Sequence, residues 1–161
     1  MSVPDGCMIR QLTPADLGLM DGLLTLFGEA FDEVETYVGR RPSAEYLRRL
    51  LGCDYFIALA ALVDGSVVGA IAAYELKKFE QERSEIYIYD LAVARNRRRQ
   101  GIASALIQEL RRLAAARGAY VLFVQADTGV EDEAAIALYT KLGTKEEVLH
   151  FDIAVGDGSA G

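Results

Sequence analysis

The stretch from Glu85 to Ala116 constrains the fold most, because it joins a strand to a helix through a basic turn. Residues Glu85–Val93 are rich in β-branched and aromatic side chains, which predicts a strand. The loop Ala94–Gln100 contains four arginines, and a helix is predicted from Gly101. The first N–H groups of a helix lack partners, and the helix dipole places about half a positive charge there. The stretch therefore predicts an anion site, such as one for pyrophosphate.

The distribution of charge is uneven. The formal net charge is −7, yet seven of the 17 basic residues and only one of the 24 acidic residues lie between Arg95 and Arg117. Nucleic-acid binding requires a broad positive surface, so this pattern disfavours it. An anionic cofactor at the basic region and a cationic substrate nearby fit the pattern. The alternative is that the acidic residues only keep the surface solvated.

The length of 161 residues predicts one domain over residues 1–155, followed by a frayed tail at 156–161. The sequence has no apolar run of 18 residues, and its first ten residues lack a signal-peptide pattern. A soluble, cytoplasmic protein that does not bind membranes is expected. Cys7 and Cys53 are too few for a disulfide framework and are expected to be reduced.

The first third of the chain predicts one strand and two helices. Met8–Leu12 alternates as a strand does, and a helix is predicted after Thr13, with Thr13 as its N-cap. Asp32–Pro42 is predicted to be a loop, and Ser43 to cap a short helix ending at Leu51. Three glycines predict that the first helix is broken or mobile: Gly18, Gly22 and Gly28.

The remaining elements predict a mixed sheet. Tyr55–Val63 and Val67–Leu76 form a hairpin through Asp64-Gly65, and with Glu85–Val93 they make an antiparallel meander. Ala119–Ala126 is a near-continuous apolar run, typical of a buried strand parallel to Glu85–Val93. A helix over Glu133–Leu142 and a final strand or hairpin half over Lys145–Val155 complete an α/β (α+β) fold with flanking helices.

Motifs for nucleotide triphosphates, dinucleotides and serine hydrolases are missing from the sequence. Between strand and helix stands Arg98–Ala103, of the form [RQ]xxGx[GA]. It resembles motif A of the GNAT superfamily of acetyl-CoA-dependent N-acetyltransferases, and Ala135–Gly143 resembles motif B. The resemblance implies the GNAT fold, a central mixed sheet in which two parallel strands splay apart to admit acetyl-CoA.

Six segments extend the resemblance to GNAT-type aminoglycoside 3-N-acetyltransferases, which are antibiotic-resistance enzymes. They are FIALAA (56–61), SEIYIYDLAV (84–93), QGIASALI (100–107), VQAD (124–127), ALYTKLG (137–143) and EEVLHFDI (146–153). The resemblance implies acetyl transfer to the 3-amino group of an aminoglycoside such as gentamicin, by direct attack in a ternary complex. It also implies a homodimer.

The cofactor would be held at both sides of the turn. Glycine at 101 lets the backbone approach a phosphate closely. Backbone N–H groups and arginines would bind the pyrophosphate, from Arg98, Arg99, Gln100, Gly101, Ile102 and Ala103. The resemblance adds main-chain contacts of the pantetheine arm with Leu91, Ala92 and Val93. At two positions the sequence differs from the residue that is frequent in the family: Asp132 stands where asparagine is common, and Thr144 where phenylalanine is common.

For catalysis, Asp90 is the candidate base and Tyr139 the candidate acid that protonates the thiolate. Alternation would put Ile86, Ile88 and Asp90 on one face, although the resemblance predicts a bulge near Asp90-Leu91 that breaks this pattern. The alternatives are that Asp90 only caps the strand end and that Tyr139 is a core residue. An aspartate of ordinary pKa is a weak base. Three roles therefore stay open for Asp90: direct removal of the proton, removal through a water molecule, or holding the ammonium group in place until it loses its proton.

A polycationic substrate calls for an acidic, polar pocket. The candidate substrate-binding residues are Glu33, Glu35, Tyr37, Tyr55, Glu85, Asp90, Asp127 and Asp152. His150, the one histidine, is a weaker candidate for the base because strand histidines are more often structural. The alternatives to an aminoglycoside are a polyamine, another small metabolite or a protein lysine, and, outside catalysis, an acetyl-CoA-binding sensor.

Overall fold

A computed structural model describes residues 3–128 and 133–156 of the chain. The chain divides into two compact units, Met1–Gln125 and Ala126–Gly161. That residues 1–155 form a single domain stays a prediction, and most of the predicted tail, residues 157–161, lies outside the described residues. In the part of the chain described here, no helix is both long and apolar enough to cross a membrane.

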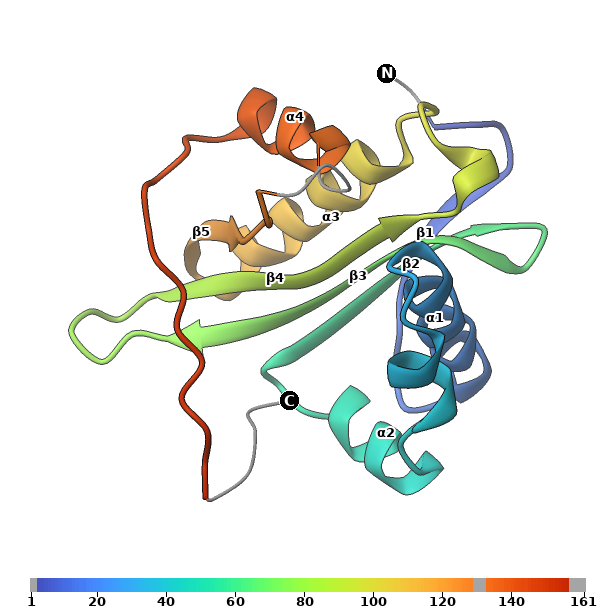
Figure 1. The fold of residues 1–161 in the computed structure, drawn as a ribbon, viewed down its shortest axis with the longest axis horizontal. Helices are drawn as coiled ribbons and strands as arrows, with labels where there is room; N and C mark the ends of the chain where they lie inside the picture. The colour runs from blue at the N-terminus through green and yellow to red at the C-terminus, as the bar shows by residue number, and fades with distance from the viewer. Residues whose placement is uncertain (1–2, 129–132, 157–161) are drawn as a thin grey trace. The chain divides into compact units, whose positions relative to one another are not determined.

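A mixed five-stranded sheet forms the centre of the first unit (Figure 1). The strands lie in chain order and pair antiparallel from β1 to β4, whereas β5 runs parallel to β4. The predicted meander and parallel pair are therefore confirmed. The strands are β1 (Cys7–Gln11), β2 (Phe56–Val63), β3 (Ser66–Lys77), β4 (Ser84–Val93) and β5 (Ala119–Val124).

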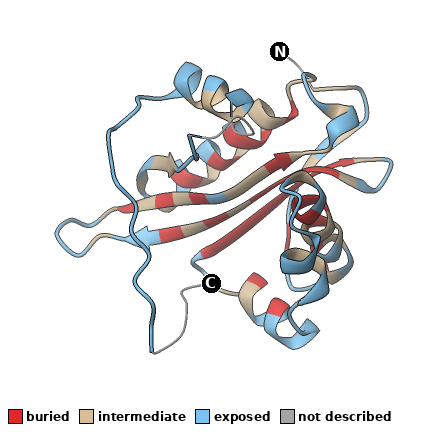
Figure 2. Ribbon diagram, in the orientation of Figure 1, coloured by how far each residue is buried: buried red, intermediate tan, exposed pale blue. Residues whose placement is uncertain are grey.

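One face of the sheet is covered by α1 (Leu17–Ala30) and α2 (Ala44–Leu51). Leu23 and Phe27 of α1 are almost fully buried. They belong to an apolar cluster that includes small residues of the sheet, Ala58, Ala60, Ala70 and Ala92. Alanines on the strands let the helix approach closely, and Figure 2 shows the resulting band of buried residues.

The opposite face is covered by α3 (Ile102–Arg117). Its residues Ile102, Leu106 and Leu110 recur at helical spacing and are fully buried. Gly69 on β3 permits this contact, because a Cβ there would lie 2.7 Å from Ile102 Cγ2 and 3.2 Å from Leu106 Cδ1. The start of α3 is thus held directly on the centre of the sheet.

The C-terminal end of α3 is fixed by a buried polar group. Arg117 Nε donates to Glu75 Oε1 at 2.9 Å, and Ser84 Oγ donates to Glu75 Oε2 at 2.5 Å. Arg117 also donates to the Asp54 carbonyl. Glu75 is only 8% exposed, so its charge is compensated where it is desolvated. Arg117 is therefore a structural residue and not part of an anion site.

The first helix differs from its prediction in two ways. It begins at Leu17 with Asp16 as N-cap, because the Thr13 N–H and hydroxyl donate to the Asp16 carboxylate and hold residues 13–16 in a turn. It is also continuous, so the prediction of a broken helix is wrong. A Cβ at Gly28 would lie 3.3 Å from Tyr37 Cβ, so this glycine serves close packing.

A single π-helical turn, η1 (Glu35–Gly39), interrupts the predicted loop of residues 32–42. It begins where the Glu33 N–H donates to the Gly28 carbonyl at 2.8 Å. The Tyr37 ring then packs on Phe27 and Phe31, with ring centroids 6.0 and 5.9 Å apart. Tertiary ring contacts stabilise a turn that has no periodic pattern of its own.

The second unit contains α4 (Glu133–Leu142), as predicted. The prediction of a final strand or hairpin half over Lys145–Val155 is wrong, because residues 144–154 have no regular secondary structure. Val148, Phe151 and Ile153 are exposed. Alternating apolar residues specify a shared side-chain face, but a strand also needs N–H and C=O partners from a neighbour.

We expect Gly69→Ala to destabilise the protein by about 1–3 kcal/mol, because the new methyl group overlaps α3 side chains. Urea denaturation measures the effect. Gly18→Ala is the control, since a Cβ there meets nothing within 4 Å and alanine favours the helix. Equal stability of the two variants would contradict the close packing of α3 on β3.

Candidate active site

A bulge in β4 determines where Asp90 points. Ala73 faces Ile88 and Ala72 faces Asp90 across the strand pair, so Tyr89 is an extra residue on β4. Ala72 packs against the cluster under α1, and Asp90 therefore turns toward that side. The predicted bulge is confirmed, and the simple alternation that groups Asp90 with Ile86 and Ile88 is wrong.

The two parallel strands separate at the same place. Pairing between β4 and β5 runs from Ser84 and Ala119 to Ile88 and Val124, and β4 continues beyond it to Val93. Leu91–Val93 keep their β3 partners, and their other edge is not used by β5. This is the predicted splay, and it leaves a strand edge to which an extended ligand can add.

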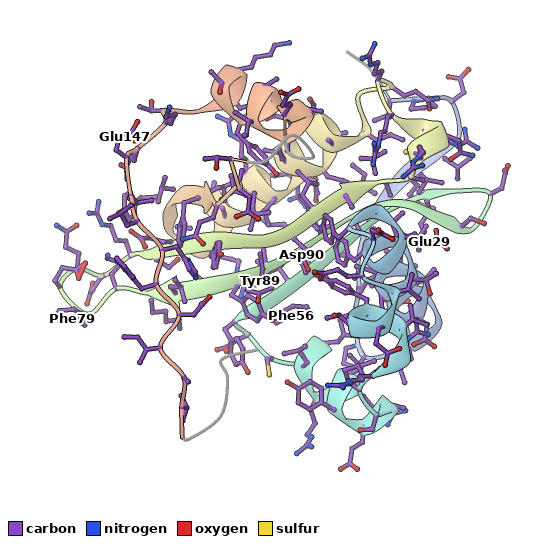
Figure 3. All side chains as sticks on the ribbon, in the orientation of Figure 1. Glu29, Phe56, Phe79, Tyr89, Asp90 and Glu147 are labelled. Atoms are coloured by element: carbon purple, nitrogen blue, oxygen red, sulfur yellow. The ribbon has the colours of Figure 1, made fainter. Side chains whose placement is uncertain are left out.

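Asp90 lies half-buried at this point, beside η1 (Figure 3). Tyr37 Oη donates to Asp90 Oδ2 at 2.8 Å. Burial, reinforced by the charge of Glu33, raises the pKa of Asp90 to about 6, although the Tyr37 hydrogen bond opposes the rise. A carboxylate with this pKa is a considerably better base than an ordinary aspartate.

Aromatic rings form a row across the sheet beside Asp90. Tyr74 and Tyr89 meet edge to face at 5.8 Å, and Tyr87 stacks on Phe123 at 4.7 Å. The ring of Phe56 lies 5.3 Å from that of Tyr74. The ring of Tyr87 lies 5.7 Å from that of Tyr89, which completes the row. Sequence reasoning did not identify this row, because it depends on strand register and on the bulge.

The N-terminus of α3 is built to receive an anion. Gly101 is its N-cap, with φ of +80°, and neither a side-chain cap nor an acidic residue occupies the first turn. Arg99 also has a positive φ, +62°. Left-handed residues in such a turn direct backbone N–H groups into a concave anion site. The Gln100 Oε1 atom is buried without a hydrogen-bond partner, but as an acceptor it cannot bind the anion itself.

A cavity of about 360 Å³ lies between the end of α1 and the basic turn. Arg98 Nε donates to the Val93 carbonyl at 3.4 Å, which ties the turn to the end of β4. Glu29 was not predicted from the sequence, since α1 is distant in the chain from the basic loop that contains Arg95 and Asn96. The lining residues are Leu26, Glu29, Ala30, Ala94, Arg95, Asn96 and Arg98.

The basic region is smaller than the sequence indicates. Arg112 pairs with Glu109, and Arg117 pairs with Glu75. Arg117 also lies roughly 20 Å from the start of α3, given a rise of 1.5 Å per residue. The arginines available for an anion at the helix N-terminus are those of the turn, Arg95–Arg99.

The predicted substrate residues of the first unit lie in different places. Glu33 and Tyr37 are near Asp90, whereas Glu35 is exposed on η1 and lies against Gly39. Tyr55 precedes β2 and is 47% exposed. Glu85 is at the opposite end of β4, where Tyr120 Oη donates to it at 2.7 Å and Lys78 Nζ lies 3.4 Å away. These contacts lower the pKa of Glu85 and separate it from the Asp90 region.

Three predicted residues belong to the second unit. Tyr139 is half-buried on α4, and Asp127 is exposed beyond the end of β5. Asp152 is exposed, and its Oδ1 lies 2.9 Å from His150 Nε2. Asp132 lies outside the described residues.

This geometry agrees with comparisons with known proteins. The chain matches the Acetyltransferase (GNAT) family over residues 21–144. A crystal structure of an aminoglycoside acetyltransferase from an uncultured soil metagenomic sample is 66% identical, with a TM-score of 0.92, covering 97% of this chain and 100% of that one. No curated protein matches the chain.

Two more distant structures are also similar. An aminoglycoside acetyltransferase from an uncultured soil metagenomic sample, in complex with sisomicin, is 31% identical, with a TM-score of 0.85 over 94% of this chain and 97% of that one. A ribosomal-protein-alanine N-acetyltransferase from Brucella melitensis is 27% identical, with a TM-score of 0.71 over 92% and 99% of the two chains.

The chain therefore belongs to the GNAT family of acetyltransferases. The splayed β4–β5 pair, the bulge and the uncapped start of α3 all lie within the matched residues.

Asp90→Asn should be more stable than the wild type at pH 8, by roughly 3 °C in Tm. The raised pKa of Asp90 means that its contribution to stability is complete below pH 3.8 and lost as pH rises through about 6. The advantage of the variant should therefore vanish near pH 4. Thermal unfolding across pH 4–8 measures it.

Asp16→Asn is the matched control with the opposite sign. The Thr13 N–H holds the pKa of Asp16 below its ordinary value, so this carboxylate stabilises the fold above that value and loses the effect in acid. An Asp90→Asn variant that behaves like Asp16→Asn would contradict the desolvation of Asp90.

Proposed function

We propose that this protein transfers the acetyl group of acetyl-CoA to the 3-amino group of an aminoglycoside antibiotic. The observation that carries the proposal is Asp90, a half-buried carboxylate at the bulge where β4 separates from β5. Antibiotic resistance and a homodimer belong to the same proposal and rest on the sequence resemblance, whereas a cytoplasmic location is proposed from the hydropathy pattern of the sequence.

The proposed coenzyme A site combines the strand edge and the basic turn. Main-chain groups of Leu91, Ala92 and Val93 accept the pantetheine arm as an added strand. The pyrophosphate is bound by N–H groups at the start of α3 and by turn arginines, with residues Arg98, Arg99, Gln100, Gly101, Ile102 and Ala103. The uncapped start of α3 and the left-handed backbone of Arg99 and Gly101 support this fit. A cofactor contact is also proposed for Asp132, on the basis of the sequence resemblance alone.

Asp90 is the proposed base. An amine attacks only when it is neutral, and a carboxylate with a pKa of about 6 removes the proton of an ammonium group more readily than an ordinary aspartate. As the new bond forms between the amine nitrogen and the acetyl carbon, the bond from carbon to sulfur breaks. Attack is direct, because the motifs contain no cysteine to carry the acetyl group.

Tyr139 is the proposed acid that returns a proton to the departing thiolate. Its assignment rests on motif B, where the hydroxyl of ALYTKLG occupies the family position. The phenolic O–H can donate a hydrogen bond to the departing sulfur and pass its proton along that bond.

The substrate site is proposed to be acidic with aromatic walls. Glu33, Tyr37 and Asp90 form its part near the bulge, where the negative charges attract ammonium groups. Glu85 is the weakest member, since Tyr120 and Lys78 already engage it. The remaining proposed members are Glu35, Tyr55, Asp127 and Asp152.

An aminoglycoside as the substrate is supported by the similar structures. The 66% identical and 31% identical proteins are both aminoglycoside acetyltransferases, and one was solved with sisomicin. The alternative is another amine, such as a polyamine, a metabolite or a protein lysine. The 27% identical protein named for acetylation of a ribosomal protein keeps this alternative open.

We expect purified protein with acetyl-CoA to release free thiol when gentamicin is added, and to do so much more slowly with spermidine. Both amines are polycations, so charge attraction alone favours neither of them. A chromogenic disulfide reagent measures the thiol, and NMR of the product locates the acetyl group. Release with spermidine but not with gentamicin would replace the aminoglycoside by a polyamine. Acetylation at another amino group would refute the 3-amino assignment only.

Asp90→Asn should lower kcat roughly 100-fold or more while leaving the affinity for coenzyme A nearly unchanged. Tyr139→Phe should also lower kcat, by slowing thiolate protonation. Steady-state rates and calorimetric titration with coenzyme A give the two quantities. Asp5→Asn and Tyr46→Phe are matched controls on exposed positions. A wild-type rate in either active-site variant would remove that residue from the mechanism.

A further inference from the structure

Tyr37 contacts Asp90 from a segment that lies 53 residues earlier in the chain. Its hydroxyl donates to one carboxylate oxygen, Oδ2, at 2.8 Å. Burial, followed by the charge of Asp90, raises the pKa of the Tyr37 phenol well above its ordinary value, so the phenol stays neutral and remains a donor. A neutral donor to a half-buried carboxylate both orients it and stabilises its ionised form.

The ring of Tyr37 is held by packing on α1. Gly28 allows η1 to approach the helix, since a Cβ there would lie 3.3 Å from both Tyr37 Cβ and Val34 Cα. Phe27 and Phe31 then contact the Tyr37 ring at centroid distances of 6.0 and 5.9 Å. The position of the hydroxyl is thus set by contacts independent of the hydrogen bond to Asp90.

The other ionisable groups around Asp90 act in a different direction. The negative charge of Glu33, next to η1, raises the pKa of Asp90. Burial and, more weakly, the charge of Asp90 raise the pKa of Tyr74 on β3 and of Tyr87 on β4, but neither hydroxyl donates a hydrogen bond to Asp90. Among the described residues, Tyr37 is the group whose hydrogen bond favours the carboxylate.

We propose that Tyr37 is a positioning residue for acetyl transfer, which holds Asp90 by its Oδ2 so that Oδ1 receives the proton of the attacking amine. The π-helical turn η1, which packs against Gly28 of α1, places Tyr37 beside Asp90. This role rests on the proposed function, and it explains how a base can be partly desolvated at the bulge and still be ionised near neutral pH.

The test compares Tyr37→Phe with the wild type in a titration of 13C-labelled aspartate carboxyl groups by NMR, without any substrate. The Asp90 signal is assigned by its loss in Asp90→Asn. Phenylalanine keeps the ring packing and removes only the donor, so the pKa of Asp90 should rise from about 6 to about 7 or more.

The same change should appear in the rates. With the carboxylate less ionised, kcat/KM should fall about fivefold further at pH 6 than at pH 9, where Asp90 is ionised in both proteins and only the loss of its orientation remains. The loss should lie in kcat, because a smaller fraction of Asp90 is ionised while the binding of the amine is unchanged. A rise in KM alone, equal at every pH, would leave Tyr37 only its proposed substrate contact and overturn the positioning role.

Gly28→Ala tests the packing of η1 on α1 while leaving the Tyr37 hydroxyl in place. The added methyl group should shift η1 by a few tenths of an ångström and weaken the hydrogen bond, so the pKa of Asp90 should rise, but by less than in Tyr37→Phe. The double variant should show no rise beyond that of Tyr37→Phe, because both changes act through the same hydrogen bond. Tyr46→Phe on α2 is the control and should leave the titration unchanged.

Failure of this inference differs from failure of the proposed function. An unchanged Asp90 titration in Tyr37→Phe, with gentamicin still acetylated by the wild type, overturns the positioning role alone. A wild type that acetylates no amine overturns the proposed function, whatever the titration shows.

Discussion

The hydrogen-bond register between β3 and β4 is the constraint on which the candidate active site depends. One extra residue, Tyr89, turns Asp90 to the side of the sheet that faces α1. Without it, alternation would bury Asp90 with Ile86 and Ile88 against α3, where a carboxylate would lack polar partners. The bulge also coincides with the last pair between β4 and β5, so a possible base and an open strand edge occur together.

The start of α3 complements this arrangement because two packing contacts hold it. Gly69 lets Ile102 and Leu106 sit on the sheet, and the Arg117–Glu75 pair holds the other end of the helix. The N-terminus is therefore rigidly placed just beyond β4 while its N–H groups remain uncapped. Rigid placement matters, since an anion site and a reacting group must keep a constant separation to be useful.

Sequence patterns predicted most of the fold and part of the site. The meander, the parallel β5, the helix from Gly101 and the bulge near Asp90 were all predicted, because they follow from local periodicity, turn residues and family motifs. The final strand over residues 145–155 was wrong, since alternation cannot supply a hydrogen-bonding neighbour. Gly28 was interpreted as a weak point in α1, because a glycine that serves close packing looks the same in sequence as one that loosens a helix.

By itself, the sequence determined the chemical character of the protein: a basic turn opening a helix, an acidic remainder and a lone acid, Asp90, at the end of a strand. Those properties depend on residues that are close along the chain. Tertiary structure alone decided that Tyr37 reaches Asp90, that Glu85 is engaged elsewhere, and that the aromatic row crosses the sheet. These contacts join residues far apart in sequence, and their existence depends on strand register and helix packing, which no local pattern encodes.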